Sequence, residues 1–271
     1  MRRGLGYAIA VLLWLAWAAP VDALELNLKG TFTQGGLVIG KTAPGATVSV
    51  GGAPAKVSRD GYFLVGLGRD APSSVQVQVR SRGQTQVRAL TIKKRQYQVQ
   101  RIDGLPKKQV TPDPAALKRI RADNRKIGAV RAQALDAVDF LSGFHWPVRG
   151  RISGVFGSQR ILNGQPRRPH NGVDVAAAPG TVIVSPADGV VALVHSDMFF
   201  TGKTLMIDHG LGLSSVYAHM SQILVRDGQR VVKGTPIGKV GQTGRASGPH
   251  LHWGVSLGRT HLDPALLAGP M

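Results

Sequence analysis

The chain has 271 residues, 43% of them hydrophobic, and it carries a formal net charge of +19 at pH 7 without a single cysteine. This hydrophobic content excludes a disordered chain, and the length leaves room for one large domain or two modest ones. The absence of cysteine excludes disulfides and restricts zinc ligands to His, Asp and Glu, a set that suits a catalytic site better than a structural one.

The N-terminus has the layout of a secretory signal peptide. Arg2 and Arg3 form a basic start, residues 5–19 are mostly apolar, and residues 21–23 offer a small-residue cleavage site. The apolar run is shorter than the roughly 20 residues that a spanning helix needs, and an uncleaved membrane anchor is the alternative. We therefore expect residues 1–23 to be a signal peptide that is removed on export to the periplasm or cell envelope.

The positive charge lies mainly before the C-terminal region. Residues 24–145 hold 20 Lys and Arg against 8 Asp and Glu, whereas residues 146–271 hold 12 against 6. Such a field raises encounter rates with polyanions, which for an exported protein are the cell wall and anionic membrane surfaces. Nucleic acid is the competing partner of a basic chain, but export puts it out of reach, so we expect no nucleic-acid binding. A cationic surface that only aids solubility is the plainer alternative.

Residues 24–105 have the pattern of a small immunoglobulin-like β-sandwich. Residues 75–80 alternate valine with polar residues, a turn follows at residues 81–84, and residues 86–92 resume strand character. Turn signals recur along the whole segment, as they do in sandwiches. No cluster of catalytic residue types occurs here. We therefore expect an accessory domain, which is a wall-binding module, a regulator of the active site or a spacer.

Residues 106–143 are predicted to form a helical linker, with one helix over residues 113–142. Asp113 can cap its N-terminus, Pro114 fits its first turn, and Gly143 follows as a stop. Apolar residues at three-, four- and seven-residue steps form one stripe: Leu117, Ile120, Ile127, Val130, Ala134, Val138 and Leu141. We expect this stripe to pack on a neighbouring domain; a membrane surface or a partner helix is the alternative.

Residues 144–271 return to short strand patterns separated by glycine-containing turns. Residues 181–184, 189–194 and 204–208 are strand candidates, and no convincing helix interrupts them. The prediction is a mostly β fold, with a compact antiparallel β domain at the C-terminus.

This last region holds five residues that suit a metal-dependent hydrolase. His170 and Asp174 lie four residues apart, His250 and His252 lie two apart, and His219 lies between these pairs. Side chains two apart on a strand share a face, so the paired histidines project together if the residue between them is turned into the core. A catalytic zinc takes three ligands of these types and leaves a position for an activated water. The spacing leaves open whether one or both of the paired histidines bind metal.

Several motifs in order give the region from about Trp146 to Pro264 a family resemblance. The motifs are residues 151–157 (RISGVFG), 170–174 (HNGVD), 187–191 (ADGVV), 217–219 (YAH), 241–244 (GQTG) and 250–253 (HLHW). Their joint order and separations make this region similar to lysostaphin-type (LytM-like) zinc endopeptidases. The resemblance implies a C-terminal antiparallel β catalytic domain of that type, with zinc in a groove across one sheet.

The resemblance also implies roles for the five residues. His170, Asp174 and His252 would bind zinc, and His219 and His250 would be the catalytic pair. The implied enzyme is a zinc metalloendopeptidase that hydrolyses the peptide cross-links of peptidoglycan through a zinc-activated water. One imidazole of the pair would accept the water's proton and pass it to the leaving amine, and the other would donate to the oxyanion.

One departure lies in residues 160–169, which lack the tyrosine that some relatives place shortly before the first ligand. Some relatives have lost ligands and act as activators of other wall hydrolases, whereas this chain keeps all three. The alternatives are a non-catalytic cell-wall-binding or activating protein and a zinc protease acting on proteins. Of the remaining histidines, we expect His145 and His195 to be structural or on the surface, His209 to lie in a turn and His261 to lie on the surface.

Overall fold

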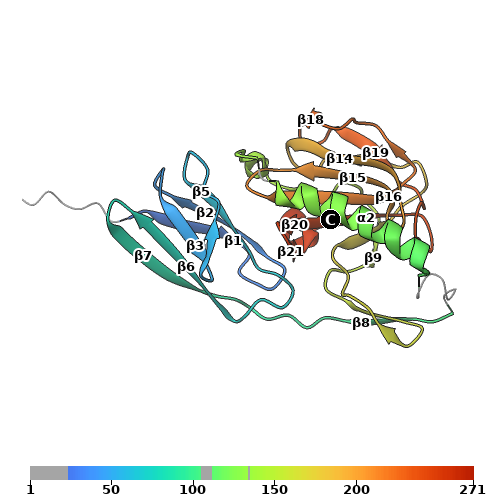
Figure 1. The fold of residues 1–271 in the computed structure, drawn as a ribbon, viewed down its shortest axis with the longest axis horizontal. Helices are drawn as coiled ribbons and strands as arrows, with labels where there is room; N and C mark the ends of the chain where they lie inside the picture. Colours follow the sequence, from blue (N-terminus) through green and yellow to red (C-terminus); the bar gives the residue numbers. More distant parts are fainter. Residues whose placement is uncertain (1–23, 105–111, 134) are drawn as a thin grey trace, which may run out of the picture.

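The computed structural model describes residues 24–104, 112–133 and 135–271. The predicted signal peptide lies outside the described residues. An N-terminal β-sandwich and a larger C-terminal β domain lie next to each other, and helix α2 (Pro114–Ala132) crosses the C-terminal domain (Figure 1). Within the described part of the chain, no helix combines the length and apolar character that crossing a membrane requires.

Seven strands build the two sheets of the sandwich, with orders β1-β2-β5 and β4-β3-β6-β7. They are β1 Leu26–Gly30, β2 Leu37–Thr42, β3 Thr47–Val50, β4 Ala53–Ala55, β5 Tyr62–Gly66, β6 Ser74–Ser81 and β7 Gln84–Thr91. Side chains from both sheets, such as Val38, Phe63 and Val77, share one hydrophobic core. The predicted N-terminal β-sandwich is confirmed.

The hairpin of β6 and β7 follows directly from its sequence. Val77 and Val79 are fully buried, because the alternation of the strand turns every second side chain to the core. The two-residue turn consists of Arg82 and Gly83, which have φ values of 48° and 77°. Positive φ at both positions matches the right-handed twist of the flanking strands, and glycine adopts it without steric cost.

The C-terminal domain is built on an eight-stranded sheet with the order β18-β14-β15-β16-β20-β12-β9, and β21 pairs with β20. Its strands are β9 Arg151–Gly154, β12 Val173–Ala176, β14 Gly189–Met198, β15 Gly202–Asp208, β16 Leu213–Met220, β18 Arg230–Val231, β20 His250–Leu257 and β21 Thr260–Leu262. A smaller sheet contains β13 Val182–Val184, β19 Pro236–Lys239 and β17 Gln222–Ile223, and the short helix α3 (Pro264–Ala268) ends the domain. All of these strand pairs are antiparallel, as predicted.

One strand from the N-terminal part of the chain joins the C-terminal domain. Strand β8 (Val99–Ile102) pairs in parallel with β10 (Gln159–Leu162), whose other edge carries β11 (Gln165–Pro166). The segment that leaves the sandwich therefore supports the hairpin that precedes His170.

Helix α2 begins where predicted and ends ten residues earlier. The Asp113 side chain accepts a hydrogen bond from the Ala116 amide at 2.8 Å, and Pro114 opens the first turn. The prediction of a helix to residue 142 was wrong, because Gln133 is extended and only a 3-10 turn, η1 (Asp139–Ser142), follows. The chain there binds the loop before β16 instead, where the Leu211 amide donates to the Leu135 carbonyl.

The sandwich packs directly on the C-terminal domain. Leu37 and Leu64 belong to the hydrophobic core of that domain, together with Leu262 of β21. Beside them, Arg95 Nη1 lies 2.7 Å from Asp263 Oδ2, and the Asp263 carboxylate is 5% exposed. These contacts tie the two domains together by apolar burial and one largely buried ion pair.

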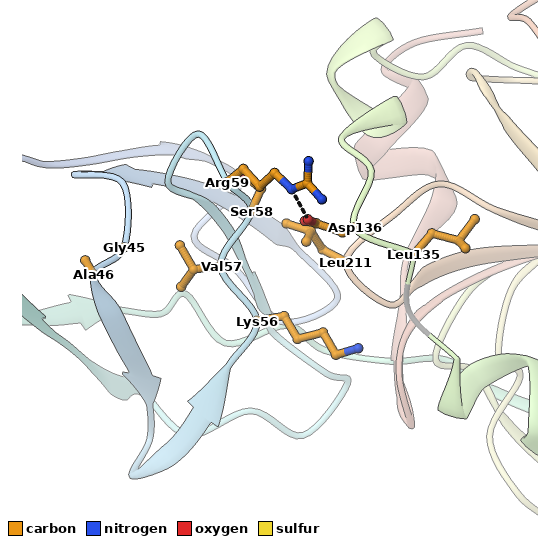
Figure 2. Close-up of a pocket in the computed structure, with 9 residues that line it drawn as sticks. All are labelled: Gly45, Ala46, Lys56, Val57, Ser58, Arg59, Leu135, Asp136 and Leu211. Carbon is orange, nitrogen blue, oxygen red and sulfur yellow. Dashed lines mark ion pairs between the residues drawn. The ribbon is translucent and has the colours of Figure 1, made fainter.

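A cavity of about 370 Å³ lies where the sandwich meets the segment after α2 (Figure 2). Lys56, Val57 and Arg59 line it from the sandwich, and Leu135 and Asp136 line it from the other side. Arg59 Nε lies 3.3 Å from Asp136 Oδ2 in an exposed ion pair. None of the five predicted site residues lines this cavity, so it is a gap at the domain junction and not the site of chemistry.

Candidate metal centre and histidine pair

Strands β12 and β20 bring the predicted residues together. Asp174 on β12 lies directly opposite His252 on β20 in the antiparallel register. Leu251 and Trp253 are fully buried, so His250 and His252 project from the other face of the same strand. The structure therefore confirms the prediction that His250 and His252 project from the same face of one strand.

His170 reaches the same point from the loop before β12. Its amide donates to the Ser158 carbonyl and its own carbonyl accepts from the Gly157 amide, which fixes the loop. Its imidazole Nδ1 lies 3.1 Å from the Val155 carbonyl. A proton on Nδ1 can then be donated to that carbonyl, which leaves the Nε2 lone pair for a ligand.

Three donor atoms converge on one spot. Asp174 Oδ1 lies 3.0 Å from His170 Nε2 and 2.8 Å from His252 Nδ1, and these two nitrogens are 3.0 Å apart. Two imidazole nitrogens and a carboxylate oxygen are the ligand set of catalytic zinc sites that keep an open position. His170, Asp174 and His252 could therefore hold a metal ion together.

The protonation states of Asp174 and His170 suit metal binding. Burial alone would raise the pKa of Asp174, but hydrogen bonds from His170 and His252 outweigh it and hold that pKa far below the ordinary range. Burial lowers the pKa of His170. An ionised carboxylate and a neutral imidazole are the forms that coordinate metals, so no proton has to leave these two groups near neutral pH.

Arg160 is a member of the site that sequence reasoning missed. Its Nη2 atom lies 3.0 Å from Asp174 Oδ2, the carboxylate oxygen that faces away from the two histidines. Arg160 stands on β10 and Asp174 on β12, so this contact joins two strands of different sheets. A single arginine in a basic chain gave no sequence signal for this contact.

His219 and His250 form a second imidazole pair beside the three donors. Their ring centroids are 4.7 Å apart, and the His219 ring is 6.3 Å from that of His252. His219 Nδ1 lies 2.8 Å from the Thr243 carbonyl, and His250 Nδ1 lies 2.8 Å from the Gly248 carbonyl. Both carbonyls favour the tautomer with the proton on Nδ1, which leaves each Nε2 able to accept a proton.

The backbone holds His219 in a strained conformation. Its φ is 63°, in the left-handed region that residues other than glycine rarely adopt. The His219 amide donates to the Thr201 carbonyl at 2.8 Å, and burial lowers the pKa of its imidazole to about 4. Strain of this kind persists where surrounding contacts fix a residue. Here the strained backbone holds the His219 imidazole next to His250, and burial keeps that imidazole neutral.

The remaining histidines lie outside this cluster. His145 contacts the carbonyl of its neighbour Trp146, and His195 on β14 contacts Lys126 on α2. His209 lies at the turn between β15 and β16, as expected, and it is fully buried there, where its ring nitrogens contact the Asp188 carbonyl and Ser215 Oγ.

The expected surface position of His261 was wrong. Strand β21 folds back along β20 and leaves His261 only partly accessible. Burial, followed by the charges of Arg131 and His252, lowers its pKa to about 4. His261 therefore lies within electrostatic reach of one of the three donors.

Comparison with known proteins agrees with this geometry. The model of Peptidase family M23 matches residues 168–264. Peptidoglycan DD-endopeptidase ShyA of Vibrio cholerae is 41% identical over 104 residues, which cover 38% of this chain and 24% of ShyA. Cell division protein DipM of Caulobacter vibrioides is 31% identical over 164 residues, which cover 59% of this chain and 25% of DipM. The matched segments thus span about a quarter of these curated relatives.

A solved structure extends the similarity beyond the matched region. The crystal structure of a Pseudomonas aeruginosa protein described as a peptidase M23 superposes with a TM-score of 0.70 at 30% identity. The superposition covers 89% of this chain and 96% of that one, so the shared fold includes more than the region that carries the five residues. The family match, the likeness over nearly the whole chain and the motifs around His170 and His252 lead to one conclusion: the chain belongs to peptidase family M23.

Proposed function

We propose that this protein is an exported zinc metalloendopeptidase that hydrolyses the peptide cross-links of peptidoglycan. The observation that carries the proposal is the convergence of His170, Asp174 and His252 within hydrogen-bonding distance of one another, next to the pair of His219 and His250. A metal-binding triad beside two imidazoles suits metal-assisted amide hydrolysis.

The donor set fits zinc. Two imidazole nitrogens and one carboxylate oxygen without thiolate are typical of catalytic zinc ligands, and His170 has the carbonyl partner that orients such ligands. A zinc ion bound there would polarise the amide carbonyl and lower the pKa of water towards neutrality. His170, Asp174 and His252 would hold it, while Arg160 keeps the outer oxygen of Asp174 in place.

His219 and His250 would carry out the proton transfers of the reaction. Each has its Nδ1 turned to a backbone carbonyl, so each Nε2 can accept a proton from the attacking water. The imidazole that accepts it can pass it to the leaving amine, as a general base that then acts as a general acid. The other imidazole can stabilise the tetrahedral oxyanion when its Nε2 has taken up a proton from solvent.

Peptidoglycan is supported as substrate by the names of the relatives and by charge. ShyA is named a peptidoglycan DD-endopeptidase, and a +19 chain is attracted to an anionic wall. The signal-like N-terminus, which lies outside the described residues, would deliver the protein to the periplasm or cell envelope.

Digestion of purified peptidoglycan tests this function. Residues 24–271 should release peptide fragments, and release should stop with a zinc chelator, in His170→Ala and in His250→Ala, while the matched control His145→Ala cleaves normally. His170→Ala should also lose zinc in a metal-content measurement, whereas His250→Ala should retain it. Intact peptidoglycan in the presence of one bound zinc per chain would contradict the enzyme and favour the alternative, a non-catalytic wall-binding or activating protein.

A further inference from the structure

We propose that Arg160, Arg167 and Arg245 form an anion subsite that binds a free carboxylate of the peptide substrate beside the scissile bond. This inference rests on the proposed function and adds the chemistry that the substrate must carry. The three guanidinium groups come from two segments that border the histidine cluster. Arg160 and Arg167 belong to the β10–β11 hairpin and its exit, and Arg245 belongs to the loop between β19 and β20.

Arg160 places positive charge directly at the metal ligands. Its Nη2 atom contacts Asp174 Oδ2 at 3.0 Å, and its Nε atom is buried without a hydrogen-bond partner. The Arg167 amide donates to the Arg160 carbonyl at 2.8 Å, so the two arginines are held on adjoining parts of one hairpin. The hairpin therefore holds the Arg160 guanidinium against Asp174 and the Arg167 guanidinium on the adjoining segment, where it donates to Gln165 Oε1.

Arg245 stands on the side of the imidazole pair. Arg245 lies two residues after Thr243, whose carbonyl faces His219 Nδ1. The Arg245 amide donates to the Phe200 carbonyl at 2.8 Å. The guanidinium lies 4.2 Å from the centre of the Phe200 ring, a cation–π contact that fixes its plane while the residue stays accessible to solvent. Arg245 is thus a positioned group at the edge of the catalytic residues and not a freely moving surface chain.

The two sides act on each other electrostatically. Partial burial, followed by the charges of Arg160 and Arg167, lowers the pKa of the Arg245 guanidinium. Like charges gathered this way repel one another, and that repulsion is relieved when an anion binds between them. Three guanidinium groups against the single carboxylate of Asp174 leave two positive charges in this group of four, before any divalent metal is added. Such a site favours a negatively charged substrate.

Carboxylate is the anion that this arrangement suits. A guanidinium presents parallel N–H donors that match the two oxygens of a carboxylate. The peptide stems of peptidoglycan carry free carboxylates close to their cross-links, whereas an amidated stem offers a neutral group of similar shape at the same place. Arg245 and Arg167 would hold that carboxylate, so the amide to be cut would be fixed relative to His219 and His250.

Binding of two matched peptides tests the subsite. The probes are synthetic cross-linked stem peptides that differ only in having free carboxylates or carboxamides beside the scissile amide. Calorimetry with zinc-loaded His250→Ala protein should give a Kd at least tenfold lower for the carboxylate form. Adding Arg245→Gln or Arg167→Gln should reduce this preference roughly tenfold or more, because a charge-assisted hydrogen bond is lost. Arg245→Lys should restore it only in part, and Arg226→Gln is the matched control on an exposed loop of the same domain.

The outcomes separate the subsite from the proposed function. Equal Kd values for the two peptides, a preference that survives both glutamine variants, or no binding of either peptide would overturn the subsite. Failure of the unsubstituted chain to cut either peptide would contradict the proposed function and would leave the Kd ratio as an independent measure of the subsite. Cleavage by the unsubstituted chain should show the same preference, expressed in KM more than in kcat.

Discussion

At Gly154 the fold leaves no room for a side chain next to the proposed metal ligand Asp174. A Cβ atom there would lie 2.3 Å from Asp174 Oδ2 and 2.9 Å from its Cγ, although the backbone conformation of Gly154 is open to any residue. Gly154 pairs with Asp174 in the register of β9 and β12. Because Gly154 has no side chain, the Asp174 carboxylate can occupy the space beside it. This gives a physical reason for the glycine in the RISGVFG motif.

We therefore expect Gly154→Ala to displace Asp174 and weaken zinc binding by about tenfold or more, because small shifts of a ligand are costly at a metal site. A competition titration with a chromophoric chelator measures the affinity. Gly128→Ala, on the exposed side of α2 where a Cβ meets nothing within 4 Å, is the control and should bind zinc normally. Unchanged affinity in Gly154→Ala would show that Asp174 adapts without loss.

His209 links the stability of the fold to pH. Burial lowers its pKa to about 4, against about 6.5 in an unfolded chain. Between these values the unfolded state binds the extra proton, so the contribution of His209 is complete above pH 6.5 and is lost as the pH falls towards 4. The shift corresponds to a loss on the order of 3 kcal/mol, to which His219 and His261 add in the same direction.

Urea unfolding should therefore give a lower free energy at pH 5 than at pH 7. His209→Gln should show a smaller difference between the two pH values, although it is less stable at both because its buried contacts are lost. His145→Gln serves as the control and should keep the full difference. A His209→Gln variant with the same pH dependence as the unsubstituted chain would contradict this assignment.

At the scale of elements, helix α2 is bound to the sheet by polar contacts, whereas of its predicted apolar stripe Val130 is buried and Leu117 is exposed. Arg119 Nη2 contacts Asp197 Oδ2 at 2.6 Å, and the buried Asp123 side chain accepts the Phe199 amide at 2.8 Å. Phe199 lies two residues before Thr201, whose carbonyl accepts the His219 amide. The helix thus supports the turn that holds one member of the imidazole pair.

Replacing Asp123 with alanine should destabilise the protein by about 1–3 kcal/mol, because a buried amide loses its acceptor. Amide hydrogen exchange at Phe199 should accelerate in this variant. Asp123→Asn keeps an acceptor oxygen and should retain most of the protection. Equal exchange at Phe199 in the alanine and asparagine variants would mean that this hydrogen bond does not anchor the helix.

At the scale of the whole molecule, the sandwich and the C-terminal domain depend on each other. Strand β8 completes the sheet of the β10–β11 hairpin, and Arg95 pairs with Asp263, which also accepts the Ala265 amide at the start of α3. A fragment of residues 144–271 would lack β8, α2 and Arg95 together. The activity of such a fragment would therefore report the loss of support for the site as well as the loss of any regulation of the active site by the sandwich.

Arg95→Ala should lower the free energy of unfolding by about 2 kcal/mol, because Asp263 is left buried with one partner fewer while Arg95 itself is partly exposed. Urea titration followed by tryptophan fluorescence checks this, since Trp253 and Trp146 lie in or against the C-terminal core. Arg88→Ala, at an exposed position of β7, is the control. A loss no larger than that of the control would indicate that apolar burial alone joins the domains.

The sequence by itself determined the features that depend on neighbouring residues. The shared face of His250 and His252 follows from the two-residue period of a strand, and the start of α2 follows from Asp113 and Pro114, because backbone geometry and capping act over a few residues. The turn between β6 and β7 is fixed in the same local way. The grouping of His170, Asp174, His219 and His252 came from motifs whose order implied a known fold.

Only the tertiary structure decided what depends on distant segments. Helix α2 ends at Ala132 because the chain beyond it binds the loop at Leu211, and no helix stop signal at that point predicts this. The pairing of β8 with β10, the contact of Arg160 with Asp174 and the burial of His209 likewise depend on how separate strands pack together. Pairing and burial are set by the packing of the whole chain, so a residue's own neighbours carry too little information to fix them.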